Sequence, residues 1–228
     1  MTFSEGLHLL AEQAKNTPVL EWIAIVAAVA EVLLARANKV LLYPAGLIST
    51  FIYTYIFLQP SVRLYADAIL NVYYFVMSVY GWVHWSRRQK AVAGAHELFP
   101  EQEPTTVRVT MATKREWLFI TVFALAGWGA LYLLLTWLFP LAIPGYVQSD
   151  VALWDALISA TAWVGMWLLA RRKVENWLLL NVSNIIAIPV ILYKGMPFTA
   201  ALTLFLFIVA IFGYIEWKKQ ARLSNTVV

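Results

Sequence analysis

A chain of 228 residues in which 61% of the side chains are hydrophobic and 13% are charged has too little polar surface for a water-soluble domain of this size. Mean hydropathy is +0.69 and the pI is about 9.3, and because the basic excess lies between apolar runs, we attribute it to membrane topology and not to nucleic-acid binding. The chain has no cysteine, which excludes disulfides, thiolate catalysis and thiolate metal ligands.

Residues 1–18 lack the basic start and the continuous apolar core of a cleaved signal peptide. Leu7, Leu10, Ala11 and Ala14 recur at helical spacing, which is typical of a helix with one apolar face. We therefore expect a short helix that lies on the external membrane surface.

Seven apolar runs follow, each long enough to cross about 30 Å of hydrocarbon as a helix. They predict an all-α integral membrane protein with seven transmembrane helices over 19–34, 40–58, 64–85, 117–139, 151–170, 177–193 and 198–217. The interpretation divides the chain into a first three-helix unit (19–85), a mobile cytoplasmic loop (86–116), a linking helix (117–139), a second three-helix unit (140–217) and a cytoplasmic tail (218–228).

The basic residues indicate how these helices are oriented. Of the 17 lysines and arginines, only Lys15, Arg63 and Lys194 fall on one side of the predicted bilayer, and the other fourteen fall on the opposite side. Cytoplasmic connections of membrane proteins carry the excess of positive charge. We therefore expect a multi-pass protein of the bacterial inner membrane with its N-terminus outside and its C-terminus in the cytoplasm.

Two short sequence matches indicate an internal repeat. Residues 33–36 (Leu-Leu-Ala-Arg) recur at 168–171, and residues 80–85 (Tyr-Gly-Trp-x-x-Trp) recur as Phe-Gly-Tyr-x-x-Trp at 212–217. Both matches lie at equivalent span ends and occur in the same order. They predict two parallel three-helix repeats joined by one linking helix (3+1+3), with a cleft between them in which a substrate would bind.

Polar and aromatic side chains follow one face of several predicted helices, where a lipid-facing surface would carry leucine and valine. We expect these side chains to line the cleft. The candidate substrate-binding residues are Ser49 and Tyr53 of the second helix, Asp67, Asn71 and Tyr74 of the third, Trp163 and Trp167 of the fifth, and Trp177, Asn181 and Asn184 of the sixth.

Simpler interpretations exist for many of these residues. Each asparagine could serve only as an interhelical contact. Trp177 could belong to the cleft or to an interfacial belt, and we assign the belt to Trp22, Trp82, Trp85, Trp117, Trp137, Trp154 and Trp217. Three carboxylates approach membrane depth, namely Glu31, Asp67 and Asp155, and none of them has an evident partner of the kind that a proton relay uses. Glu31 could simply reach the cytoplasmic surface.

The residue types that are missing narrow the chemistry further. No lysine or arginine lies in the central part of a predicted span, so a substrate phosphate would lack its usual charge partner. The three histidines are too dispersed for a shared metal site, and no catalytic dyad or phosphate loop is present, so we expect no enzyme activity, no metal and no cofactor. An aromatic and amide-lined cleft suits a flat, neutral or cationic molecule with hydrogen-bonding groups.

The most distinctive motif lies in the last two helices. Trp177-Leu-Leu-Leu-Asn181-Val-Ser-Asn184, followed by Pro189 and by Tyr-Lys-Gly at 193–195, resembles the PnuC family of nicotinamide riboside transporters. The Gly-Tyr-x-x-Trp motif at 213–217 and the span 155–171 fit the same family. The resemblance implies a fold related to the SWEET sugar transporters and facilitated diffusion of a vitamin B3 precursor for NAD biosynthesis, driven by a cytoplasmic riboside kinase.

Alternatives remain open at this stage. A SWEET-type sugar transporter would have the same repeat, and relatives in the family carry other B vitamins such as thiamine or riboflavin. A membrane-embedded enzyme or an assembly protein is a third alternative. The expected partners are the lipid bilayer, a small-molecule substrate and the riboside kinase, but not nucleic acid, and the sequence leaves open whether the chain forms a homo-oligomer.

Overall fold

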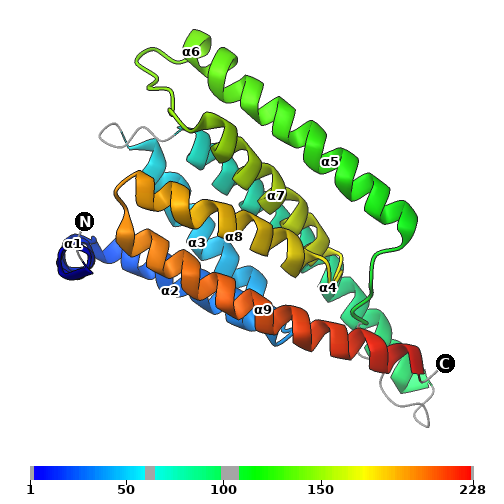
Figure 1. Cartoon of the computed structure of the whole chain (residues 1–228). Helices are drawn as coiled ribbons and strands as arrows, with labels where there is room; N and C mark the ends of the chain where they lie inside the picture. The colour runs from blue at the N-terminus through cyan, green and yellow to red at the C-terminus, as the bar shows by residue number, and fades with distance from the viewer. Residues whose placement is uncertain (1–2, 60–64, 99–107, 227–228) are drawn as a thin grey trace.

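The computed structural model describes residues 3–59, 65–98 and 108–226, and these are helical apart from turns and one isolated β-bridge between Thr110 and Lys173. Figure 1 shows the elements in chain order. They are α1 (Phe3–Asn16), α2 (Val19–Arg36), α3 (Leu42–Leu58), α4 (Tyr65–Leu98), α5 (Lys114–Leu133), a π-helical turn η1 (Leu134–Leu138), α6 (Phe139–Ala142), α7 (Ala152–Ala170), α8 (Asn176–Tyr193) and α9 (Pro197–Thr226).

A helix lies at each predicted span, but the predicted loop 86–116 differs from the structure. Helix α4 continues to Leu98, so the first part of the supposed loop is helical. The last part is held in place by pairing with the α7–α8 connection, because Thr110 donates its backbone N–H to the Arg172 carbonyl and Val174 donates to the Thr110 carbonyl. Residues 99–107 lie outside the described part of the chain.

Within the described residues, four helical segments are long and apolar enough to cross a membrane: Lys114–Ala142, Ala152–Ala170, Asn176–Tyr193 and Pro197–Leu223. The other three predicted spans do not meet these criteria for identifiable reasons. Helix α2 carries Glu21, Glu31 and Arg36 within 18 residues, and the apolar α3 has only 17. Helix α4 has no charged residue between Asp67 and Arg87, but Asn71, His84 and three tyrosines lower its hydropathy. The count of seven transmembrane helices therefore stays a prediction.

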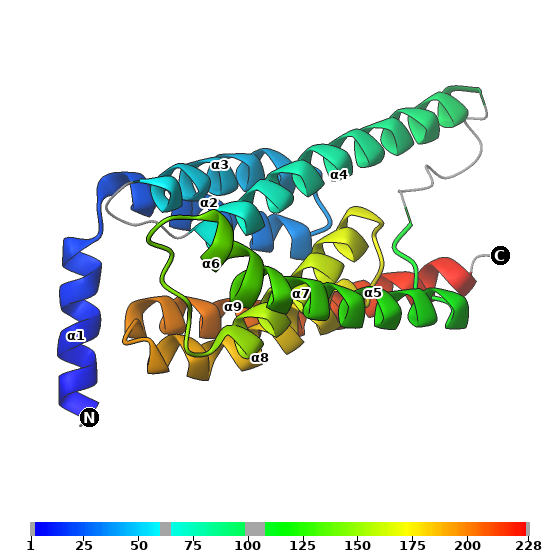
Figure 2. The ribbon, with the colours of Figure 1, turned by 90° about the horizontal axis from the view of Figure 1, so that it is seen from above.

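Six helices form a closed ring in which each packs on the next, in the order α2, α3, α4, α7, α8 and α9, with α9 returning to α2. Helix α5 packs on the outside of this ring against α7, as Figures 1 and 2 show from two directions. Helix α1 lies crosswise at one end of the bundle, where Gln13 Nε2 donates to the Gly195 carbonyl at 3.0 Å. The ring places residues from both predicted units around one central axis.

The helix outside the ring has well-defined limits. Thr113 and Glu116 form a capping box at its start, which satisfies two otherwise unpaired backbone donors. The π-helical turn η1 precedes Pro140, whose ring has no backbone N–H to donate and would crowd the carbonyl four residues earlier. The prediction of a linking helix over 117–139 thus corresponds to a continuous helical segment from Lys114 to Ala142.

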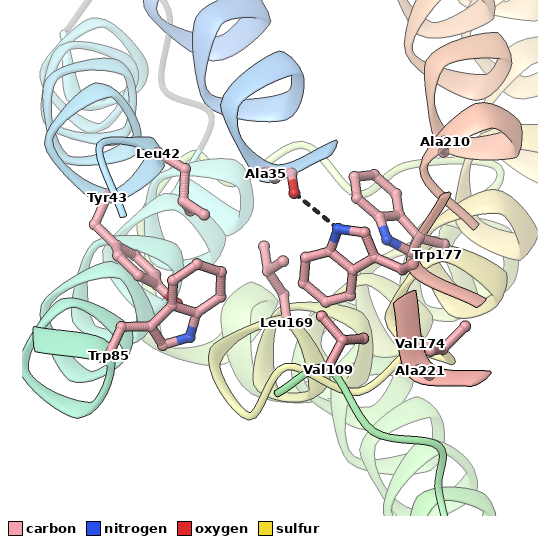
Figure 3. Packing of buried hydrophobic residues seen from close by; sticks show 11 residues of the cluster. Ala35, Leu42, Tyr43, Trp85, Val109, Leu169, Val174, Trp177, Ala210 and Ala221 are labelled. Atoms are coloured by element: carbon pink, nitrogen blue, oxygen red, sulfur yellow. Dashed lines mark hydrogen bonds between the residues drawn. The ribbon is translucent and has the colours of Figure 1, made fainter. Parts of the chain in front are cut away.

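An aromatic cluster of Tyr43, Trp85, Trp177 and Trp217 fills the ring at the end where α2 and α7 finish (Figure 3). Trp85 and Trp217 are both 0% exposed, so their assignment to an interfacial belt was wrong. The Trp85 indole donates to the Ala170 carbonyl and the Trp217 indole donates to the Ala35 carbonyl, each at 3.0 Å. Each tryptophan therefore ties the last helix of one predicted unit to the first helix of the other.

Candidate functional site

The polar stripe of α4 lies on the helix face that points into the ring. Asp67, Asn71, Tyr74 and Ser78 recur at intervals of three or four residues and continue in register to the buried Trp85. The opposite face of α4 is exposed at Val72, Val76, Val79 and Val83, as expected for a lipid-facing surface. Tyr74 and Asn71 are half-buried, and Asp67 is exposed.

Helices α4 and α7 meet through an aromatic stack that the sequence analysis missed. The rings of Tyr73 and Trp163 are 4.9 Å apart at 28°, and the Tyr73 hydroxyl donates to the Trp163 carbonyl at 2.9 Å. The Trp163 Nε1 atom is buried and has no hydrogen-bond partner among the described residues. A buried indole donor of this kind is available to a bound molecule or to water.

Helix α8 contributes the two predicted amides. Ser183 donates to the Ile158 carbonyl at 3.0 Å and so faces α7, while Trp177 lies against Gly213 of α9. Asn181 and Asn184 share the Trp177 face and are half-buried. The Asn181 Oδ1 atom is buried without a partner among the described residues, so this amide resembles the Trp163 indole in having unused hydrogen-bonding capacity.

Two predicted site residues, Trp177 and Trp167, lie away from the stack of Tyr73 and Trp163. Trp177 is only 1% exposed and packs edge-on against Trp217 at 5.6 Å, which makes it part of the aromatic cluster and neither a belt residue nor a neighbour of the Trp163 stack. Trp167 faces the outer helix α5, where its ring is 5.3 Å from that of Phe119 and carries the Arg171 guanidinium at 4.6 Å. The spacing of four residues predicted that Trp163 and Trp167 share one face of α7, but it gave no indication that α5 covers the Trp167 ring.

Helix α3 contributes less than predicted. Ser49 is 3% exposed and Tyr53 is half-buried, with its ring stacked on Phe57 at 5.5 Å. Among the described residues, no hydrogen bond or ring contact joins either side chain to the amides of α8. Both residues stay candidates on the sequence prediction alone.

One of the three carboxylates near membrane depth has partners that the sequence did not reveal. Lys194 Nζ lies 2.7 Å from Asp155 Oδ1, and the Ser149 hydroxyl donates to Asp155 Oδ2 at 2.6 Å, so Asp155 is paired. Asp67 lies within electrostatic range of both Lys194 and Asp155. These three groups therefore form a charged cluster at the end of the ring opposite the aromatic cluster.

A basic group lies at the aromatic end. Arg172 is 3% exposed and its guanidinium lies 3.5 Å from the centre of the Trp85 ring, a close cation–π contact. Burial lowers the pKa of Arg172 to about 10, so the side chain still carries its charge at neutral pH. This charge lies in the α7–α8 connection, where it contacts the aromatic cluster through Trp85.

Comparisons with known proteins agree with this architecture. A family model described as nicotinamide mononucleotide transporter matches residues 18–219. The nicotinamide riboside transporter PnuC of Escherichia coli is 27% identical over 211 residues, covering 89% of this chain and 87% of the relative. PnuC of Neisseria mucosa is 26% identical over 208 residues, covering 88% and 73%. A crystal structure titled as the vitamin B3 transporter PnuC superimposes with a TM-score of 0.66 over 97% of this chain and 93% of the other, at 22% identity.

Proposed function

This chain belongs to the family of nicotinamide mononucleotide transporters, and on that premise we propose that it carries nicotinamide riboside across the inner membrane by facilitated diffusion. Members of this family are membrane transporters and not enzymes. The family description names the mononucleotide, whereas the similar proteins of known name are riboside transporters. The residues within the ring favour the riboside.

The observation that supports this choice most directly is the pair of unused polar groups at Asn181 and Trp163. Nicotinamide riboside has a carboxamide, which is both donor and acceptor, a ribose with hydroxyl groups, and a flat cationic ring. An asparagine amide can pair with the carboxamide or a hydroxyl, and aromatic faces attract a cation by roughly 0.5–2 kcal/mol. Asn71, Tyr74 and Asn184 would complete the site from the facing helices.

The phosphate of the mononucleotide is the group that the site does not suit. No lysine or arginine lies in the middle of any predicted span, and Lys194 is already paired with Asp155. Removing a phosphate dianion from water without a cationic partner is strongly unfavourable. We therefore propose that the transporter takes the riboside and that phosphorylation by a cytoplasmic kinase makes uptake effectively irreversible.

The proposed architecture is two parallel repeats around the ring axis, α2–α4 and α7–α9, linked by α5. Equivalent backbone details support it. Asn38 and Arg172 follow α2 and α7 with the same positive φ of 55°, and Lys39 and Lys173 donate to Leu34 and Leu168 in the same way. These pairs are 134 residues apart, one fewer than the sequence match at Ala35 and Ala170 suggested. Together with the bias of the basic residues, this topology supports the proposal that the N-terminus lies outside.

Calorimetric titration of the purified protein with nicotinamide riboside, its mononucleotide, nicotinamide and free ribose tests the proposal. The riboside should bind, the mononucleotide should bind far more weakly, and ribose alone should not bind. Equal affinity for riboside and mononucleotide would contradict the assignment of the site, because a basic residue would then have to reach the substrate. Binding that follows the sugar and ignores the pyridinium ring would favour a SWEET-type sugar transporter instead.

A further inference from the structure

Glu31 is the carboxylate that the substrate site has not yet accounted for. It lies on the same face of α2 as Ala24 and Ala35, which are 0% and 2% exposed, so this face points into the ring and not toward lipid. Within the part of the chain that the structure describes, no hydrogen bond or ion pair reaches its carboxyl group. The suggestion that Glu31 simply reaches the membrane surface does not fit this position.

The carboxyl group of Glu31 occupies a space that a glycine leaves open. A Cβ atom at Gly46 of α3 would lie 2.5 Å from Glu31 Oε1 and 2.7 Å from its carboxyl carbon, well inside ordinary van der Waals contact. Any larger residue at position 46 would therefore displace the carboxylate. The tyrosines Tyr43 and Tyr74, from the two neighbouring helices, lie within electrostatic range of the same group.

The corresponding place in the second unit is apolar. With the interval of 134 residues found for the helix ends, Glu31 corresponds to Gly165 and Gly46 corresponds to Leu180. The structure brings these two equivalents together as well, because a Cβ at Gly165 would lie 2.9 Å from the Leu180 side chain. Both units thus pack a glycine against a large side chain at the same helix contact, but the helices exchange roles: the first unit has an acid on α2 and a glycine on α3, and the second has a glycine on α7 and a leucine on α8.

We propose that Glu31 is a specificity-determining residue, whose carboxylate gives this transporter its preference for a cationic substrate over an uncharged one of the same shape. The inference rests on the proposed function and names the residue that would distinguish a cationic substrate from an uncharged one. A carboxylate inside the ring without a cationic partner is costly to bury, and a substrate cation that passes close to it offsets part of that cost. The equivalent contact of the second unit, between Gly165 and Leu180, has no charged group.

The test compares nicotinamide riboside with its reduced form, which keeps the carboxamide and ribose but has an uncharged dihydropyridine ring. Affinities of both compounds are measured by calorimetry for the wild type and for Glu31→Gln, which removes the charge and keeps the shape. We expect Glu31→Gln to weaken binding of the cation about tenfold or more and to change binding of the reduced compound less than about twofold. Glu21→Gln, in the first turn of the same helix, should leave both affinities unchanged.

A second variant moves the carboxylate without removing it. Gly46→Ala should reduce the preference for the cation, whereas Gly165→Ala, which crowds Leu180, should leave the preference unchanged even if the protein becomes less stable. Equal losses for both compounds in Glu31→Gln would mean a structural role and would overturn the inference, as would an unchanged preference. A wild type that binds neither compound would instead contradict the proposed function, and the inference would fall with it.

Discussion

The close approach of α9 to Trp177 gives the sharpest test of the aromatic cluster. A Cβ atom added at Gly213 would lie 2.7 Å from Trp177 Cε2 and 2.8 Å from two further ring atoms, where ordinary contacts are 3.4 to 4 Å. The indole has little room to retreat, because it also packs edge-on against Trp217 and is only 1% exposed. Overpacking of a core costs about 1–3 kcal/mol, and the gain in helix propensity from glycine to alanine recovers at most about 1 kcal/mol.

Gly213→Ala should therefore destabilise the protein by about 1–2 kcal/mol, which in a chain of this length lowers the melting temperature by several degrees. The matched control is Gly129→Ala in α5, where an added Cβ meets nothing within 4 Å and only the favourable propensity change applies. Thermal unfolding in one detergent, followed by circular dichroism, compares both variants with the wild type. If Gly213→Ala melted at or above the temperature of Gly129→Ala, the packing described for the aromatic cluster would be incorrect.

Four further predictions concern the stability of the aromatic cluster, the substrate site, the driving force of uptake and the orientation in the membrane. Trp217→Phe loses the indole hydrogen bond and should cost about 1–3 kcal/mol of stability, whereas Trp117→Phe on the exposed face of α5 should change stability by less than about 0.5 kcal/mol in the same melts. Asn184→Ala and Trp163→Ala should weaken riboside binding roughly five- to 150-fold while Trp117→Ala binds nearly normally, and calorimetry that ranked them otherwise would move the site. Uptake into proteoliposomes should stop at equilibrium, and accumulation driven by a proton or sodium gradient without a kinase would refute facilitated diffusion. A tag at Val228 should be protected from external protease in spheroplasts, and its cleavage there would reverse the orientation.

The positions of the helices were predictable because length and hydropathy are properties of the chain itself. The ends of the helices were harder to predict, as helix α4 shows. Hydropathy falls sharply at residue 87 because of Arg87 and Arg88, and this was taken as the start of a loop. Arginine, lysine, glutamine and alanine are all good helix formers, so the helix continues after its apolar part has ended. A change in hydropathy marks a change of solvent and not the end of a helix.

The direction in which each side chain points was harder to predict. Trp85 and Trp217 lie at the ends of apolar runs, where a lipid-facing belt and an inward-facing cluster look the same in sequence. One signal was present, because Gly81 and Gly213 precede these tryptophans by four residues and lie on the same helix face. In the structure both glycines admit a close aromatic neighbour, Tyr43 in one case and Trp177 in the other.

The two proposed repeats have similar residues at the end of the ring that the aromatic cluster fills, and they have different residues where the substrate would bind. An internal sequence match can therefore reveal the shared packing but not the substrate site. Both units use a glycine, an edge-on aromatic pair and an indole hydrogen bond at the closed end. At the same interval of 134 residues, Asn181 corresponds to Leu47 and Asn184 to Thr50, so the amide wall of α8 has no copy on α3. Two related repeats can use the same packing contacts, but a substrate with a carboxamide at one end and a sugar at the other is not symmetric. The residues that recognise it must therefore be sought among the positions at which the repeats disagree, and Glu31, whose counterpart at this interval is Gly165, belongs to that set.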